Sequence, residues 1–526
     1  MRTTLLHDVA VPQQITERRG PLWPLAISVL LLGMLCAVDL FFTVKLCGGH
    51  FVYALDDTYI GAAMAKNFAL HGVWGVTRYA FTSATSTPFW VLLLSAAYRV
   101  FGVSQWTALV MSLTFAVLTL IAADRLLLKS LSTRTRAIGL VAIVLFTPLH
   151  VIGLIGMEHS LHALLALIFL RLSADLVVDH HWRLWLLPVV PAMVMVRYES
   201  MFLIAPVVLF LAVQRRWKWS AGLAGLAWLP VILYGALSVS KGWYWLPNSI
   251  SMKGASGHHL FLHVLAVSAK APHLVVVLIA LPILAYISRD NRRASYMLWV
   301  VFLAGCLHLA MADAGWTYRY EDYLLAAAIA ATAFALPALQ KAVRREPALA
   351  LVLVVPVAML AGRCAMATVN LPKYSRAIYT QQYQMARFVH RYYEGEAIAA
   401  NDIGAINFFS DVRCVDLVGL SNRDIFFAKR SDSYTTEVID RESQAVHASI
   451  AIVYDAWFSN KPSRFGGPPL PGQWKRIARW KVSDKEELGS DIVSFYAIKP
   501  KEAEQLRQEL QEFDGSLPPG VTVIQN

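Results

Sequence analysis

The sequence predicts a polytopic α-helical membrane protein with about eleven transmembrane helices, followed by a C-terminal α/β domain. Hydrophobic residues make up 57% of the 526 residues and charged residues only 16%. Apolar stretches of about 20 residues, long enough to cross a bilayer, recur through the first two thirds of the chain. Soluble proteins carry about 25% charged residues, so an ordinary cytosolic enzyme is excluded. The net charge of +12 lies in short clusters between the apolar stretches, which excludes a nucleic-acid-binding protein.

The first predicted span covers residues 22–44 and is preceded by Arg18 and Arg19. It is too long for the apolar region of a signal peptide and lacks a small-residue cleavage site, so we interpret it as a retained span. Residues 88–101 are apolar but too short to cross, and we expect them to form a helix at the membrane interface. The remaining predicted spans are 104–123, 137–155, 159–178, 184–196, 200–213, 220–240, 272–287, 295–311, 323–340 and 348–368.

Lys and Arg residues cluster in every second connection between the predicted spans. Because basic residues are retained on the cytoplasmic side of a membrane, these connections are predicted to be cytoplasmic, with the N-terminus inside and the C-terminus outside. The clusters are Arg18–Arg19, Arg125–Arg136, Arg183, Arg215–Lys218, Arg289–Arg293 and Lys341–Arg345.

The composition changes after residue 368. Residues 374–393 show a polar helical pattern, and short β-like runs follow, among them 450–454 and 492–498. We therefore predict two domains, a transmembrane domain over 1–368 and an outer-face α/β domain over 369–526. The five cysteines form no C-x-x-C pair, so neither a disulfide framework nor a zinc site is predicted.

The connections on the predicted outer side are chemically mixed. They carry carboxylates, aromatic side chains and single cations, whereas the predicted cytoplasmic connections are merely basic. This difference predicts that the functional site lies on the outer face. The candidate site residues are Asp56, Asp57, Tyr59, Glu158, Arg197, Glu199, Asn248, Lys253, Arg319 and Glu321.

Asp56 and Asp57 follow the first span, where two adjacent carboxylates are costly unless they face water or a partner. A carboxylate at this place can take the proton from an acceptor hydroxyl as a general base. The pair can instead hold a divalent cation, the one cofactor left open. A third interpretation is a pair of helix-capping residues. The amphipathic segment 59–74 is too polar to span, and an interfacial helix there suits a membrane-embedded substrate; its alternative is a structural plug.

The tripeptide Arg-Tyr-Glu occurs twice, at 197–199 and 319–321. Arg and Glu two positions apart do not share a helix face, so both tripeptides are expected at helix ends or in loops. Either Arg can clamp a phosphate, and the alternative is an ion pair that joins two helix ends. Lys253 is a further phosphate contact or a solvated loop residue, and Glu158 is interpreted as a capping residue between two spans.

Several of these motifs resemble GT-C-type membrane glycosyltransferases. Their order resembles most closely the mycobacterial terminal arabinofuranosyltransferase and its bacterial relatives, and the resemblance extends along most of the chain. The motifs are Tyr53–Ile60, His71–Gly75, Thr85–Trp90, Gly156–Glu158, Arg197–Glu199, Pro247–Lys253, Arg319–Glu321, Asn401–Ala405 and Asp416–Leu420.

The resemblance implies a glycosyltransferase of the bacterial inner membrane with its site and C-terminal domain on the periplasmic or extracellular face. It implies a polyprenyl-phosphate-linked sugar donor, D-arabinofuranose being one option, and a cell-envelope glycan, lipid or protein as acceptor. Asp56 or Asp57 is then the essential carboxylate, with Asp56 ranked first. The donor phosphate and sugar would contact Lys253, Arg197, Arg319, Asn248, Glu199, Glu321, Tyr59 and Glu158.

Two other function classes remain open from the sequence. A transporter or flippase of polyprenyl lipids with a periplasmic cap would show an ionisable path through the membrane and repeat symmetry. The predicted spans show little of either apart from Asp39. A structural subunit of an envelope assembly would use the acidic residues only to hold the fold together.

Overall fold

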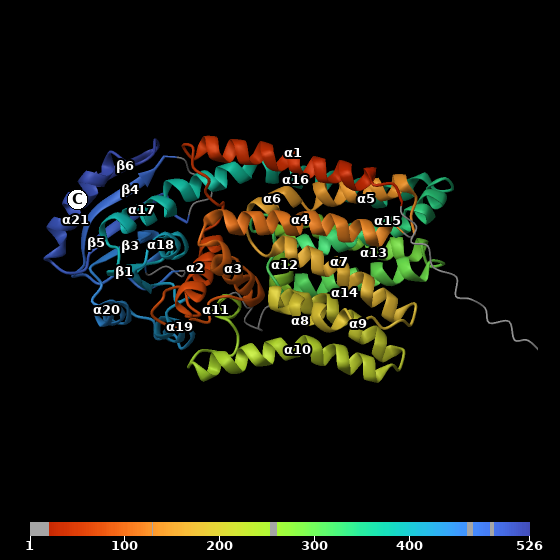
Figure 1. Cartoon of the computed structure of the whole chain (residues 1–526), viewed down its shortest axis with the longest axis horizontal. Coiled ribbons are helices and arrows are strands. Elements are labelled where there is room, and N and C mark those ends of the chain that lie inside the picture. Colours follow the sequence, from red (N-terminus) through yellow and green to blue (C-terminus); the bar gives the residue numbers. More distant parts are fainter. Residues whose placement is uncertain (1–19, 129, 253–259, 460–465, 484–488, 526) are drawn as a thin grey trace, which may run out of the picture.

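A computed structural model of the chain describes residues 20–128, 130–252, 260–459, 466–483 and 489–525. Helices with roughly parallel axes form a bundle, and the C-terminal domain lies at one end of this bundle (Figure 1). The structure confirms a polytopic helical membrane protein with a C-terminal α/β domain.

Seven helical segments in the described part of the chain are long and apolar enough to cross a membrane. Helices α12 (Leu260–Lys270) and α13 (Pro272–Ile287) meet at 100° and make an eighth crossing if they form one broken span. The seven are α1 (Trp23–Leu46), α4 (Gln105–Leu127), α7 (His159–Val177), α10 (Trp217–Ser240), α14 (Arg292–Met311), α15 (Asp322–Val343) and the run Pro347–Tyr392, which contains η2 (Pro347–Ala350), α16 (Leu351–Thr380) and α17 (Gln382–Tyr392).

The other predicted spans form shorter helices. Residues 137–155 are divided between α5 (Thr133–Phe146) and α6 (Leu149–Leu154), because Pro148 between them has no amide N–H to continue a helix. Residues 184–196 and 200–213 form α8 (Leu186–Val196) and α9 (Met201–Val213), which are joined by the 3-10 turn η1 (Tyr198–Ser200). Every predicted apolar stretch is therefore helical, but not each one is a full-length span.

Two short helices, α2 (Asp56–His71) and α3 (Pro88–Phe101), occupy the connection between α1 and α4. The bounds of α3 are those predicted for the interfacial helix. Gly72 ends α2 with a φ of 68°, a left-handed conformation that favours glycine. Both helices lie at the end of the bundle that faces the C-terminal domain (Figure 1).

The C-terminal domain is built on a six-stranded mixed sheet with the strand order β2-β1-β3-β5-β4-β6. β1 pairs in parallel with β2 and β3, and the remaining pairs are antiparallel. The predicted boundary at residue 368 lies inside α16, so one helix continues from the bundle toward this domain. The strands are β1 (Ala397–Ala400), β2 (Arg413–Asp416), β3 (Ile450–Val453), β4 (Lys475–Val482), β5 (Ile492–Ala497) and β6 (Val521–Gln525).

Helices cover this sheet and connect it to the bundle. Phe388 of α17 packs against Trp480 and Phe495 of the sheet, with ring centroids 6.0 and 5.4 Å away, and these residues form part of the domain core. The other elements are α11 (Asn248–Ser251) before α12, and α18 (Gly404–Phe409), α19 (Arg423–Arg430), α20 (Thr436–Ala445), η3 (Asp455–Trp457) and α21 (Glu502–Asp514) in the domain.

Candidate active site

A network of charged side chains lies where the ends of α2, α7, α8 and α15 meet. It contains five of the predicted site residues, Asp57, Glu158, Arg197, Glu199 and Arg319. The contact between Asp57 and Arg319 joins positions that are 262 residues apart in the sequence. The connections predicted to share the outer face thus converge in space.

Asp57 and Arg319 form the accessible edge of this network. Arg319 Nη2 donates a hydrogen bond to Asp57 Oδ2 at 2.5 Å. The Arg319 side chain is 2% exposed, whereas that of Asp57 is 45% exposed. A buried guanidinium therefore orients a carboxylate that solvent can still reach.

Arg197 is held by two carboxylates. Its Nη1 donates to Glu158 Oε1 at 2.7 Å, and its Nη2 donates to Glu199 Oε1 at 2.5 Å. The Tyr320 ring connects the two arginines, because the guanidinium groups of Arg197 and Arg319 lie 5.4 and 5.1 Å from its centroid, within cation–π distance. Both Arg-Tyr-Glu tripeptides lie at helix ends, and the pair between Arg197 and Glu158 joins the end of α8 to the start of α7.

Glu321 belongs to a second buried cluster beside the first. It accepts hydrogen bonds from Arg363 Nη2 of α16 at 2.9 Å and from the backbone amide of Gly315 at 3.0 Å, and its Oε1 lies 3.1 Å from His273 Nε2. The sequence reasoning missed both Arg363 and His273. The available signal was the position of Arg363 inside an otherwise apolar predicted span, where a charged residue needs a partner.

Asp56 and Asp57 are the first two residues of α2, but their carboxylates face different partners. Asp56 accepts the backbone N–H groups of Gly404 and Ala405 in the C-terminal domain, at 2.7 and 2.8 Å. Burial and then the nearby Asp402 carboxylate raise the pKa of Asp56 to about 8, although the two amides oppose this shift. Both acids lie in the first turn of α2, at the positive end of its dipole, which agrees with the helix-capping interpretation. Of the two acids, only Asp57 forms an ion pair with Arg319.

The divalent-cation interpretation of the aspartates has little geometric support. Within the residues that the structure describes, no three His, Cys, Asp or Glu side chains form a group that could hold a metal ion. Asp56 faces backbone amides and Asp57 faces a guanidinium, so the two carboxylates do not converge on one point.

Tyr59 and Asn248 join the membrane part to the C-terminal domain. Tyr59 is fully buried, and its ring lies 5.7 Å from that of Phe408. The Asn248 carboxamide, also fully buried, donates to the carbonyl oxygen of Leu420 at 2.9 Å. Their observed contacts are therefore interdomain packing contacts. Lys253 lies outside the described residues.

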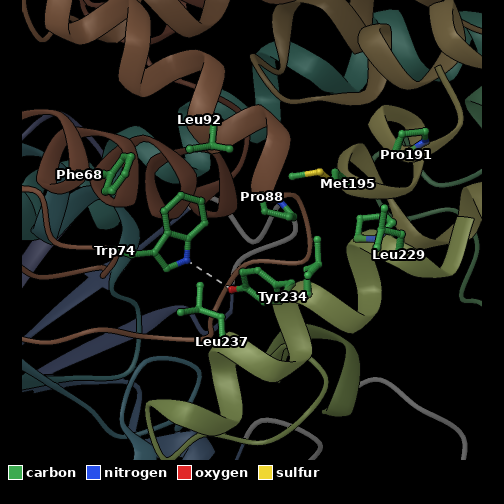
Figure 2. A pocket seen from close by; sticks show the side chains of 11 residues that line it. Phe68, Trp74, Pro88, Leu92, Pro191, Met195, Leu229, Tyr234 and Leu237 are labelled. Atoms are coloured by element: carbon green, nitrogen blue, oxygen red, sulfur yellow. Dashed lines mark hydrogen bonds between the residues drawn. The ribbon is translucent and has the colours of Figure 1, made fainter. Parts of the chain in front are cut away.

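An apolar cavity of about 450 Å³ lies between the first-loop helices α2 and α3 and the helices α8 and α10 (Figure 2). At its edge the indole N–H of Trp74 donates to the hydroxyl oxygen of Tyr234 at 3.3 Å. Met195 of α8, two positions before Arg197 in the sequence, also lines the cavity. The other lining residues include Phe68, Pro88, Leu92, Pro191 and Leu233.

Comparison with known sequences adds information about the C-terminal domain. Residues 375–496 match a family described as a domain of unknown function (DUF8728). No curated protein matches the chain.

Comparison with solved structures concerns nearly the whole chain. The chain is similar to the oligosaccharyltransferase of Archaeoglobus fulgidus in its apo form, with a TM-score of 0.50 and 12% identity over 94% of this chain and 78% of that one. It is also similar to ArnT from Cupriavidus metallidurans bound to undecaprenyl phosphate, with a TM-score of 0.51 and 12% identity over 92% of this chain and 99% of that one. Such low identities show the fold alone, and the closer likeness to arabinofuranosyltransferases stays a prediction. The chain shares the fold of these two proteins.

Proposed function

We propose that the protein is a membrane glycosyltransferase that moves a sugar from a polyprenyl-phosphate donor to an acceptor at the outer face of the bacterial inner membrane. The observation that carries this proposal is the pair of Asp57 and Arg319, in which a buried guanidinium orients a half-exposed carboxylate at the start of α2. The fold likeness to an oligosaccharyltransferase and to ArnT bound to undecaprenyl phosphate supports the same reaction class.

Asp57 is the proposed general base. Its carboxylate would take the proton from the acceptor hydroxyl while the acceptor oxygen bonds to the anomeric carbon of the donor sugar. The bond from that carbon to the phosphate oxygen breaks, and polyprenyl phosphate leaves. The resemblance ranks Asp56 first, but both oxygens of Asp56 already accept backbone N–H groups, so the contacts favour Asp57 as the reacting carboxylate.

Arg197 and Arg319 are the proposed contacts of the donor phosphate, with Lys253 as a third. Each of the two arginines already forms an ion pair with a carboxylate. The guanidinium group must therefore bind the phosphate and that carboxylate together. This sharing would keep the guanidinium groups oriented before the donor binds, and it would offset part of the affinity that a free arginine would supply.

The apolar cavity is the proposed site for the first isoprene units of the donor. Its lining is hydrophobic and includes residues of the first-loop helices and Met195 of α8, the helix that ends next to Arg197. A lipid chain placed there would bring its phosphate to the arginine network. D-arabinofuranose is the sugar favoured by the resemblance, and an envelope glycan, lipid or protein is the acceptor.

Purified full-length protein in lipid nanodiscs tests the proposal. A panel of short-chain polyprenyl-phosphate sugars, D-arabinofuranose included, is incubated with the protein, and released polyprenyl phosphate is measured by mass spectrometry. We expect release with at least one donor when envelope extract supplies acceptors. Movement of intact donor across proteoliposomes without cleavage would instead identify a flippase and would refute a transferase.

A further inference from the structure

The short helix α18 of the C-terminal domain is held at both ends by side chains of α2. Asp56 accepts the amides of Gly404 and Ala405 at its start. Lys66 Nζ donates to the carbonyl oxygens of Asn407, Phe408 and Ser410 at its end, at 2.7, 2.8 and 3.1 Å. The Asp56 oxygens, which accept at the N-terminus, and the Lys66 ammonium, which donates at the C-terminus, satisfy backbone groups that every helix leaves without internal partners. We call this arrangement, Asp56 and Lys66 around residues 404–410, the α18 clamp.

The backbone of α18 approaches α2 so closely that only glycine fits at its first position. A Cβ atom at residue 404 would lie 2.2 Å from the backbone oxygen of Asp56 and 2.6 Å from its Oδ2. Such distances require one segment to move away from the other. The close approach is therefore an independent sign that this contact is specific, beyond the two sets of hydrogen bonds.

The clamp acts on the residue next to the proposed general base. Asp56 and Asp57 are consecutive residues in the first turn of α2. When the backbone and side chain of Asp56 are fixed against α18, the rotation of that turn is fixed too, and it directs Asp57 toward Arg319.

We propose that the α18 clamp positions Asp57 for catalysis, with Asp56 and Lys66 as positioning residues. The C-terminal domain then supports turnover by orienting a carboxylate of the membrane part. This inference rests on the proposed function only in taking Asp57 as the reacting carboxylate; the mechanical coupling from α18 to α2 can be tested without turnover.

Hydrogen exchange of the full-length protein in nanodiscs tests the coupling. The variants are Lys66→Met, which removes the ammonium, and Gly404→Ala, which forces the helices apart. Lys66→Arg keeps a cation with several donors and should restore the clamp. The matched control is Arg78→Gln, which removes a cation from a half-exposed ion pair with Asp411 at the same boundary between domains.

We expect Lys66→Met and Gly404→Ala each to raise the exchange rate of the α18 amides roughly tenfold or more. The first variant removes the hydrogen bonds of the Lys66 ammonium, and the second separates the Gly404 and Ala405 amides from Asp56. The amides of residues 60–63, whose helical acceptors lie in the first turn of α2, should respond in parallel. The double variant should exceed the single variants by much less than the product of their effects, because both break one contact. Lys66→Arg and Arg78→Gln should stay near wild type.

Faster exchange confined to α18, with residues 60–63 unchanged, would overturn the positioning role, as would independent effects in the double variant. With a donor that turns over, Lys66→Met should lower kcat at least tenfold and leave KM nearly unchanged. A fall in thermal stability with unchanged kcat would also overturn it. If no donor is cleaved by the wild type, the proposed function fails while the exchange result still decides the coupling.

Discussion

Replacement of Asp57 by asparagine separates catalysis from stability more sharply than any other single change in the site. Asparagine has nearly the same size and keeps one oxygen that can accept from Arg319, but it cannot take a proton from a hydroxyl. General-base assistance contributes about 10²–10⁴-fold to a rate, so Asp57→Asn should lower kcat by at least the smaller factor.

The structure predicts only a small cost in stability for the same change. A hydrogen bond between charged groups contributes about 1.5–3 kcal/mol. The lower part of this range applies because the Asp57 side chain is 45% exposed and water screens the pair. The amide oxygen retains part of the bond, which leaves a loss of about 1 kcal/mol, against typical domain stabilities of about 5–15 kcal/mol. The variant should therefore fold and insert.

The assay measures release of polyprenyl phosphate by wild type, Asp57→Asn and the control Asp514→Asn, an exposed aspartate at the end of α21. Thermal melting in the same nanodiscs reports folding. A kcat within threefold of wild type in Asp57→Asn would refute the assignment of Asp57 as general base. A variant that fails to fold would show that the carboxylate mainly holds the network together.

Three further outcomes follow from the same structure. Leu233→Trp narrows the apolar cavity and should raise KM for a polyprenyl donor several-fold. The control is Ile232→Trp, at the neighbouring position of α10, which does not line the cavity and should leave KM unchanged. Equal KM values in the two variants would exclude the cavity as the lipid site. The pKa of the Asp56 carboxyl is raised to about 8 in the folded protein, from an ordinary value near 3.8. The folded state therefore binds the carboxyl proton more tightly than the unfolded state, and the stability that this proton contributes is lost as the pH rises from about 4 to 8. Wild type should therefore lose stability between pH 5 and pH 8, whereas Asp56→Asn, which is uncharged over this range, should lose less; an equal pH dependence of the two melting temperatures would contradict the raised pKa. If the basic connections are cytoplasmic, a reporter fused after Lys218 should lie inside and one fused after Lys373 should lie outside. The opposite locations would show that the predicted topology is wrong.

Local features of the site could be predicted from the sequence. Arg and Glu separated by one residue cannot share a helix face, and both Arg-Tyr-Glu tripeptides lie at helix ends. The apolar stretch 88–101 is a helix with the same bounds in the structure, because its composition and length leave few alternatives. Secondary structure that depends only on residues near in the sequence could therefore be predicted.

Ion pairs between segments that are far apart in the chain could not be predicted from a single sequence. The partner of Arg319 is Asp57 rather than Glu321, and Glu321 instead meets Arg363. These choices depend on how α15 and α16 pack against the first loop, which no local pattern records. The contact between Asp56 and the start of α18 could not be predicted either, because Asp56 binds backbone amides, which every residue except proline has.

A structure of the full-length protein in nanodiscs with a non-cleavable polyprenyl-phosphonate sugar tests the central claim most directly. We predict that the phosphonate lies within hydrogen-bond distance of Arg319 or Arg197, with the lipid chain entering the cavity beside Trp74 and the anomeric carbon on the exposed side of Asp57. An analogue bound at the opposite end of the helix bundle, or with its anomeric carbon remote from Asp57, would contradict the account.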